Sequence, residues 1–119
     1  MKNTATVRPS ALETTLNRWH QQGHVINFDT EYNHSDKVYE FEQIAIEPGH
    51  WNYGDVVSAI IRDRYPNDAM EAIINNYLPY AADPSSAPQT IKEEFDSMQA
   101  WRAHAKEVAH SYFQNNETD

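Results

Sequence analysis

The stretch of sequence that decides the fold runs from Tyr39 to Leu78 and reads YEFEQIAIEPGHWNYGDVVSAIIRDRYPNDAMEAIINNYL. It is rich in apolar side chains and contains none of the usual catalytic motifs. Its first part alternates like a strand and ends at Pro48 and Gly49, and the remainder has the three- and four-residue spacing of helices on either side of Pro66. The stretch therefore predicts a packing unit, a strand followed by two helices, rather than a reaction centre.

The strand at the beginning of this stretch changes its apolar face along its length. Tyr39 and Phe41 lie on one face of the strand, whereas Ile44 and Ile46 lie on the other. A β-bulge near Glu42-Gln43 would reconcile the two pairs, and so would a strand that is covered on both faces at different points. The sequence leaves both arrangements open.

A second strand is expected over 24–29, where Ile26 and Phe28 alternate with polar residues. Turn-forming residues over 32–37 join it to the strand over 39–47. Two strands alone are marginally stable in water, so this antiparallel hairpin must pack on helices or pair with the edge of another chain.

Helical spacing recurs in four segments of the chain. They are residues 10–22, 55–64, 68–78 and 89–113. The first begins with Ser10-Ala-Leu-Glu13, the pattern of a capping box, and ends at Gly23, whereas the last would make a helix of about seven turns. The expected fold is therefore α+β, an antiparallel β-hairpin packed with about four helices, of which the last is long.

Chain length and the composition of the two ends set the expected domain boundaries. A chain of 119 residues suits one domain with one core. Residues 1–9 contain little that can be buried, and residues 114–119 are wholly polar. We therefore expect a flexible N-terminal arm over 1–9, a single domain over 10–113 and a flexible C-terminal tail over 114–119.

The composition argues against several classes of function. With 18 acidic and 9 basic residues, the formal charge of -9 repels phosphate backbones, so direct nucleic-acid binding is disfavoured. The chain has no cysteine and therefore no disulfide, thiolate metal site or cysteine nucleophile. No apolar run approaches the length of a membrane span, and the N-terminus lacks the apolar stretch of a signal peptide. We expect a soluble cytoplasmic protein that makes no membrane contact.

The six histidines raise the question of a metal site, which their spacing decides. Glu107 and His110 form the Glu-x-x-His fragment of carboxylate-bridged metal sites, but such sites need two fragments and further glutamates. His104 lies about 240° around a helix from His110, so these two cannot converge alone. We therefore expect no metal ligands, no cofactor and no catalytic residues. A small metal-dependent hydrolase stays open only as a third alternative, behind the two functions given at the end of this section.

Carboxylates are concentrated over 28–47, a segment with six acidic residues and one Lys. Two pairs of them face each other on the expected hairpin, and such pairs can serve as acid and base. Strand faces that point to solvent are normally polar, so we favour an acidic interaction face over catalysis. Two aromatic residues after the second strand either close the core or, where exposed, meet a partner. The residues expected to bind a partner are therefore Asp29, Glu31, Glu40, Glu42, Trp51 and Tyr53.

A family resemblance is carried by three motifs: YEFEQI at 39–44, the helical pair that ends in YPNDAMEAIINNYL at 65–78, and EEFDSMQAWRAHAKEVAH at 93–110. With these motifs the chain resembles small proteins encoded in phage or prophage tail regions of gut bacteria. The resemblance covers residues 39–110 and implies a virion-related or tail-assembly context, in the host cell or on the virion. It implies no catalytic residue.

The sequence thus favours a non-enzymatic protein that acts by contact with a protein partner or by self-association, as a phage virion or tail accessory protein. The alternative is an acidic mimic of nucleic acid that occupies a DNA-binding protein of the host, which the carboxylates over 28–47 would favour. The long final helix has an apolar stripe wide enough for the core or for a second copy, so both a monomer and a homo-oligomer stay open.

Overall fold

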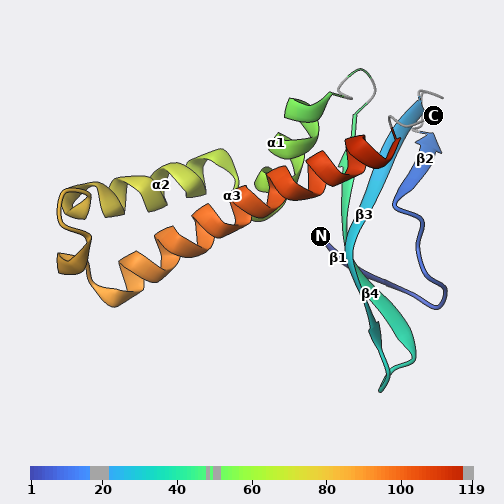
Figure 1. Ribbon diagram of the computed structural model, residues 1–119, viewed down its shortest axis with the longest axis horizontal. Coiled ribbons are helices and arrows are strands. Elements are labelled where there is room, and N and C mark those ends of the chain that lie inside the picture. The colour runs from blue at the N-terminus through green and yellow to red at the C-terminus, as the bar shows by residue number, and fades with distance from the viewer. Residues whose placement is uncertain (17–21, 48, 50–51, 117–119) are drawn as a thin grey trace.

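The computed structural model describes residues 1–16, 22–47, 49 and 52–116 and has an α+β fold (Figure 1). The strands are β1 (Lys2–Ala5), β2 (Leu12–Leu16), β3 (Gln22–Asn33) and β4 (Val38–Ile46). The helices are α1 (Tyr53–Arg64), α2 (Asn67–Tyr77) and α3 (Gln89–Asn116), and the 3₁₀ segments η1 (Leu78–Tyr80) and η2 (Pro84–Ser86) join α2 to α3. The described residues therefore hold three α-helices, fewer than the four expected, and the last is long as expected.

The strands form one antiparallel sheet in the order β1-β4-β3-β2, so the expected hairpin of β3 and β4 lies at its centre. The turn that joins them is built as the sequence predicts. Asn33 Oδ1 accepts the backbone N–H groups of Ser35 and Asp36, at 2.9 and 3.0 Å. Lys37 takes a positive φ of 57° at the entry to β4.

The helix expected over 10–22 is wrong, because Leu12–Leu16 form strand β2 at one edge of the sheet. Apolar residues four apart fit one face of a helix and one face of a strand equally well. The β-branched Thr14 and Thr15 favour the strand, and the exposed edge of β3 supplies its hydrogen bonds. Gly23 is not a helix stop but lies within β3, opposite Thr15.

Ser10 does not cap a helix but anchors the connection between β1 and β2 to the sheet. Its carbonyl accepts a hydrogen bond of 2.7 Å from Asn27 Nδ2 on β3. Asn27 is buried, and its Oδ1 accepts from Gln43 Nε2 at 2.9 Å, so both ends of its amide are paired. Trp19, expected on the same helix, lies outside the described residues.

The sheet begins before the domain boundary expected at residue 10. Lys2–Ala5, which the sequence places in a flexible arm, form β1 and pair with β4. At the other end, α3 continues to Asn116, beyond the expected limit at residue 113, and residues 117–119 lie outside the described part of the chain. Strand β1 and the last turn of α3 therefore belong to the folded domain.

A β-bulge interrupts the central pair of strands, and it lies in β3 rather than at the position expected in β4. Phe28 pairs with Glu42 and Glu31 pairs with Glu40, so β3 has one more residue than β4 between these pairs. Asp29 lies in the bulge and adopts a positive φ of 54°. The change of apolar face along β4 is therefore explained by the other arrangement that the sequence allows, in which the strand is covered on both faces.

The core lies on the face of the sheet that α1 and the C-terminal half of α3 cover (Figure 1). Phe41 and Ile44 are buried although three positions separate them in β4, so each face of this strand is covered at a different point. Trp101 Nε1 donates a hydrogen bond of 3.0 Å to the carbonyl of Ile60 and so satisfies its polar atom inside the core. The core residues are Ile26, Phe28, Ile44, Ile46, Val56, Val57, Ile60, Trp101, Ala105 and Ala109.

The second helix and the first half of the third extend away from the sheet as a two-helix layer, which we call the helical arm (residues 67–98; Figure 1). Tyr77 and Phe95 stack across it with ring centroids 3.9 Å apart and planes 5° apart, and Ile73 and Met98 are buried. The molecule measures 49 × 39 × 31 Å along its principal axes. None of the described helices, α3 included, is both long and apolar enough to cross a membrane.

Candidate functional site

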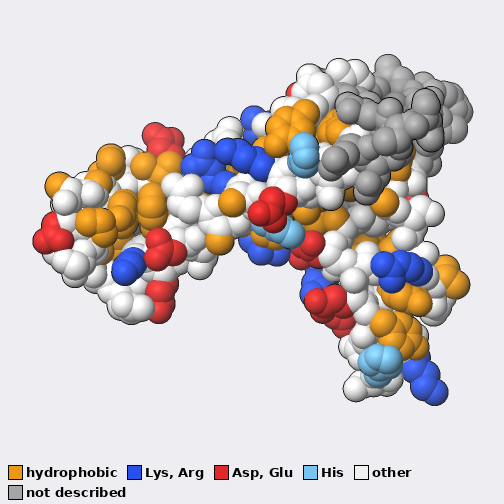
Figure 2. Space-filling model, in the orientation of Figure 1, with side chains coloured by type: hydrophobic (Ala, Val, Ile, Leu, Met, Phe, Trp, Pro, Cys, Tyr) orange, Lys and Arg blue, Asp and Glu red, His pale blue; other side chains and the backbone are white. Residues whose placement is uncertain are grey.

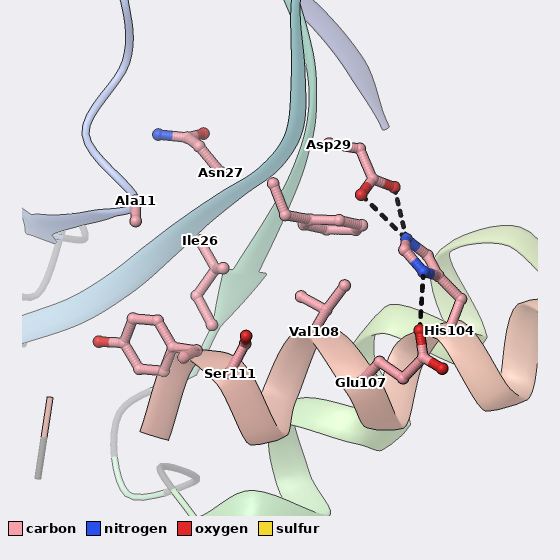
Figure 3. A pocket seen from close by; sticks show the side chains of 10 residues that line it. Ala11, Ile26, Asn27, Asp29, His104, Glu107, Val108 and Ser111 are labelled. Carbon is pink, nitrogen blue, oxygen red and sulfur yellow. Dashed lines mark hydrogen bonds and ion pairs between the residues drawn. The ribbon is translucent and has the colours of Figure 1, made fainter. Parts of the chain in front are cut away.

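A pocket of about 370 Å³ lies between β3 and the C-terminal half of α3 (Figure 3). Its apolar lining is Ala11, Ile26, Phe28, Val108 and the ring of Tyr112, and its polar lining is Asn27, Asp29, His104, Glu107 and Ser111. In Figure 3, Asp29, His104 and Glu107 lie together, while Ile26 and Val108 point into the space between strand and helix. The pocket therefore has a charged end and an apolar interior.

A hydrogen-bonded pair, Asp29 and His104, forms the charged end. His104 Nε2 lies 2.9 Å from Asp29 Oδ1 and 2.7 Å from Oδ2. Because a carboxylate only accepts hydrogen bonds, the Nε2–H group of the imidazole is the donor. The other ring nitrogen, Nδ1, lies 3.9 Å from Glu107 Oε2. His104 is thus placed between two carboxylates, one from the sheet and one from its own helix.

The bulge in β3 explains how a strand residue reaches this helix. A β-bulge changes the direction of a side chain relative to the regular pleat. Asp29 adopts its positive φ within the bulge and turns its carboxylate toward α3, as Figure 3 shows. The ring of His104 is held in turn by Phe28 and Trp101, with centroids 6.5 and 5.6 Å away. The bulge therefore directs the carboxylate, and the two aromatic rings pack beside the imidazole.

The pair has part of the geometry of a catalytic dyad, but no nucleophile among the described residues lies beside it. A neutral imidazole oriented by Asp29 would present Nδ1 as a base. Ser111, the serine that lines the pocket, lies seven residues after His104 on α3, about 10 Å along the helix axis. A hydroxyl so far from the base cannot be activated by it. The arrangement is better suited to holding a ligand than to nucleophilic catalysis.

Tyr112 lies at the same pocket and is buried. Burial raises the pKa of its phenol, because the phenolate would lose its hydration in this environment. Tyr112 therefore keeps its proton at neutral pH and adds no charge to the pocket.

The four carboxylates expected to form one acidic face are separated by the fold, and Glu42 is the clearest case. The sequence places it toward solvent, but its side chain is 13% exposed and this expectation is wrong. Glu42 Oε1 accepts from the guanidinium of Arg64 at 3.2 Å, and its Oε2 lies 3.4 Å from the amino group of Met1. The Arg64 guanidinium in turn lies 3.5 Å above the ring of Trp101. Glu42 therefore connects the sheet to α1.

Glu31 and Glu40 face each other across β3 and β4, away from the pocket. Glu40 Oε1 accepts from Asn33 Nδ2 at 2.8 Å, and its Oε2 lies 3.9 Å from Lys2 Nζ. Of the four expected carboxylates, only Asp29 lines the pocket.

The two expected aromatic residues have different outcomes. Trp51 lies outside the described residues. Tyr53 begins α1 and is exposed, and its hydroxyl donates a weak hydrogen bond of 3.4 Å to the carbonyl of Lys106. Its ring centroid lies 6.3 Å from that of Phe113. Tyr53 therefore packs at the junction of α1 and α3, apart from the acidic residues.

Among the residues that the structure describes, no group of three or more His, Cys, Asp or Glu side chains is placed to hold a metal ion. The sequence pairs Glu107 with His110, but in the structure His104 lies between Glu107 and Asp29. The sequence did not indicate this pairing, because Asp29 and His104 are 75 positions apart and meet only through the bulge.

The comparisons with known proteins add no identification: no family model, no curated protein and no solved structure matches the chain.

Proposed function

We propose that this protein is a non-enzymatic binding protein that acts through protein–protein contacts, as an accessory of phage virion or tail assembly. The helical arm carries the proposal. A compact domain of this length has a radius of gyration of about 13.5 Å, whereas that of this chain is 17.2 Å. The arm extends well beyond the sheet, which gives the molecule more surface than its own core requires (Figure 1).

The arm presents apolar side chains at its surface, because a layer of two helices can bury only one face of each. Leu78 at its end is 59% exposed, and Met70, Ile74 and Ile91 are half-buried. Figure 2 shows hydrophobic side chains gathered over this limb of the molecule. Apolar surface on a projecting element is typical of a contact site for another protein.

The phage context is supported by the resemblance of residues 39–110 to proteins of phage and prophage tail regions. The YEFEQI motif lies in β4, at the centre of the sheet, and the helical pair of the resemblance is α1 and α2. The resemblance therefore includes the element that projects, as well as the core that carries it.

The two alternative functions, a nucleic-acid mimic and a metal-dependent hydrolase, have less support. An acidic mimic of nucleic acid depends on carboxylates over 28–47, but Glu40 and Glu42 lie beside Lys2 and Arg64 of the same chain, which reduces the charge they present. A metal-dependent hydrolase would need a ligand set, which the described residues do not provide.

Site-specific photo-crosslinking in the cell that makes the protein would test the proposal. A photoreactive phenylalanine analogue replaces Leu78 on the arm, and Val7, which is exposed in the connection between β1 and β2, serves as the matched control. We expect a discrete adduct, with a protein partner or a second copy, at position 78 and none at position 7. No adduct at position 78, or equal adducts at both positions, would contradict a binding role for the arm.

A further inference from the structure

We propose that the pocket between β3 and α3 binds a small organic cation, a primary amine carried on an apolar stem. Glu107 and the Nδ1 atom of His104 would receive the ammonium group, and the walls formed by Ile26, Phe28 and Val108 would receive the stem. Asp29 would hold the imidazole from the opposite side of the ring. The pocket lies on the sheet, apart from the helical arm, so this proposal stands or falls independently of the proposed protein contact (Figures 1 and 3).

The size and lining of the pocket fit a small ligand. Its volume of about 370 Å³ falls within the range of about 300 to 1,000 Å³ that is typical of small-molecule sites. Such sites combine mainly apolar walls with a few placed polar groups that orient the ligand. Here the polar groups Asp29, His104 and Glu107 gather at one end, as Figure 3 shows. A matching ligand carries its polar group at one end of an apolar body.

The charges of the site select a cation. Two carboxylates and one imidazole give the charged end a net negative charge whether the ring of His104 is neutral or protonated. None of the described residues that line the pocket is Lys or Arg. An anionic ligand would therefore meet repulsion, whereas a cation gains charge-assisted hydrogen bonds in a partly apolar cleft.

The hydrogen-bonding capacity of the site matches an ammonium group. The carboxylate of Asp29 has about four acceptor positions, of which the Nε2–H of His104 uses the region between its two oxygens. The Nδ1 atom of a neutral His104 is a second acceptor, and Glu107, whose side chain is 80% exposed, is a third that can move over the mouth. Nδ1 and Glu107 Oε2 lie 3.9 Å apart, so one ammonium group can donate to both, while Asp29, on the opposite side of the ring, adds negative charge and holds the imidazole through Nε2–H.

The backbone of Asp29 explains why its carboxylate is directed to this end of the pocket. A positive φ is uncommon for a residue other than glycine and costs free energy, so it persists where other interactions hold it. The bond to His104 supplies that restraint here.

A titration followed by NMR tests the proposal on the full chain. The probe is phenethylamine, and 2-phenylethanol, which has the same stem and a neutral hydroxyl, is the matched ligand control. We expect saturable shifts of the amides of Phe28, His104 and Val108 with phenethylamine, and binding at least about tenfold weaker with the alcohol.

Two variants test the carboxylates. Asp29→Asn removes the charge while asparagine tolerates the positive φ of the bulge, and Glu107→Gln changes an exposed side chain, so both should fold. Each substitution should weaken the binding of phenethylamine several-fold. The control is Glu94→Gln, the same change on an exposed residue of α3 about 20 Å along the helix, which should leave the affinity unchanged. The proposal is overturned if the amine gives no saturable shifts up to about 10 mM, if the alcohol binds equally well, or if Glu94→Gln weakens binding as much as Glu107→Gln.

Discussion

At the scale of single residues, Glu42 shows how a distant partner changes the role of a side chain. On a strand that alternates, its neighbours predict a solvent-facing carboxylate, as they do for Glu40. The guanidinium of Arg64, which comes from the C-terminal turn of α1, covers it and lies over Trp101 at the same time. Glu42, Arg64 and Trp101 therefore link the sheet, α1 and α3, and no periodicity in the sequence encodes that link.

The two glutamates should respond differently to loss of charge. Glu42→Gln leaves the Arg64 guanidinium beside a neutral amide at a position that is 13% exposed, so we expect the free energy of unfolding to fall by about 1–2 kcal/mol. Glu40→Gln removes the long, partly exposed ion pair with Lys2. This substitution should change the free energy of unfolding by no more than about 0.5 kcal/mol. Urea unfolding of both variants measures the difference, and equal midpoints would contradict the structural role given to Glu42.

Tyr112 gives a prediction of pH dependence. Burial raises the pKa of its phenol above the ordinary value near 10, so at alkaline pH the unfolded chain releases this proton while the folded chain retains it. The folded state then binds more protons, and stability falls as pH rises above about 10. We expect Tyr112→Phe to show a smaller loss of stability than the parent between neutral and alkaline pH. Urea midpoints at several pH values measure it, and parallel losses in both proteins would show that Tyr112 does not contribute.

At the scale of elements, local signals predicted most of the fold. Helix α1 begins where Asn52 caps it, with Asn52 Oδ1 accepting from the backbone N–H of Asp55 at 2.8 Å, and it ends before Pro66. The hairpin and the long α3 follow equally local patterns. Strand β2 was missed because the spacing of Leu12 and Leu16 suits two structures, and its pairing with β3, a tertiary contact, decides between them.

The candidate site was predictable only in part. The sequence pairs Glu107 with His110, whereas in the structure Glu107 lies beside His104, three positions before it on α3. Asp29 was expected to lie on an acidic strand face, and the bulge instead directs it to α3. A bulge has no strong signature in a strand that lacks glycine at that point, so the pocket and its charged end were not foreseen.

Substitutions that leave a cavity should have different effects on stability in the helical arm and in the core on the sheet. Ile60 is fully buried between α1, the sheet and α3, and Ile60→Ala should lower the free energy of unfolding by about 2–5 kcal/mol. Ile73 is buried in the arm, so Ile73→Ala should loosen α2 first. Hydrogen exchange measures this: amides of α2 should exchange faster in Ile73→Ala while those of β3 and β4 keep their protection. Equal loss of protection in both elements would mean that the arm and the sheet unfold as one unit.

At the scale of the whole molecule, shape and charge together distinguish the two kinds of partner that the arm can meet. The arm, residues 67–98, carries six acidic residues and one Lys. Two copies that meet through their arms would bring like charges together, so added salt should promote their association by screening the repulsion. A heterologous partner selected by this surface would be basic, and added salt should weaken that complex.

Light scattering and small-angle X-ray scattering at low and high salt would measure this difference. If the arm is the interface between copies, the solution mass should rise with salt and protein concentration. Leu78→Glu, which adds a charge at an exposed large hydrophobic residue of the arm, should prevent the rise. If the partner is heterologous, the protein should stay a monomer with a radius of gyration near 17.2 Å at every salt concentration. A monomer with a radius near the compact value of about 13.5 Å would instead mean that the arm folds back onto the sheet in solution, and the surface on which the proposed protein contact depends would then be internal.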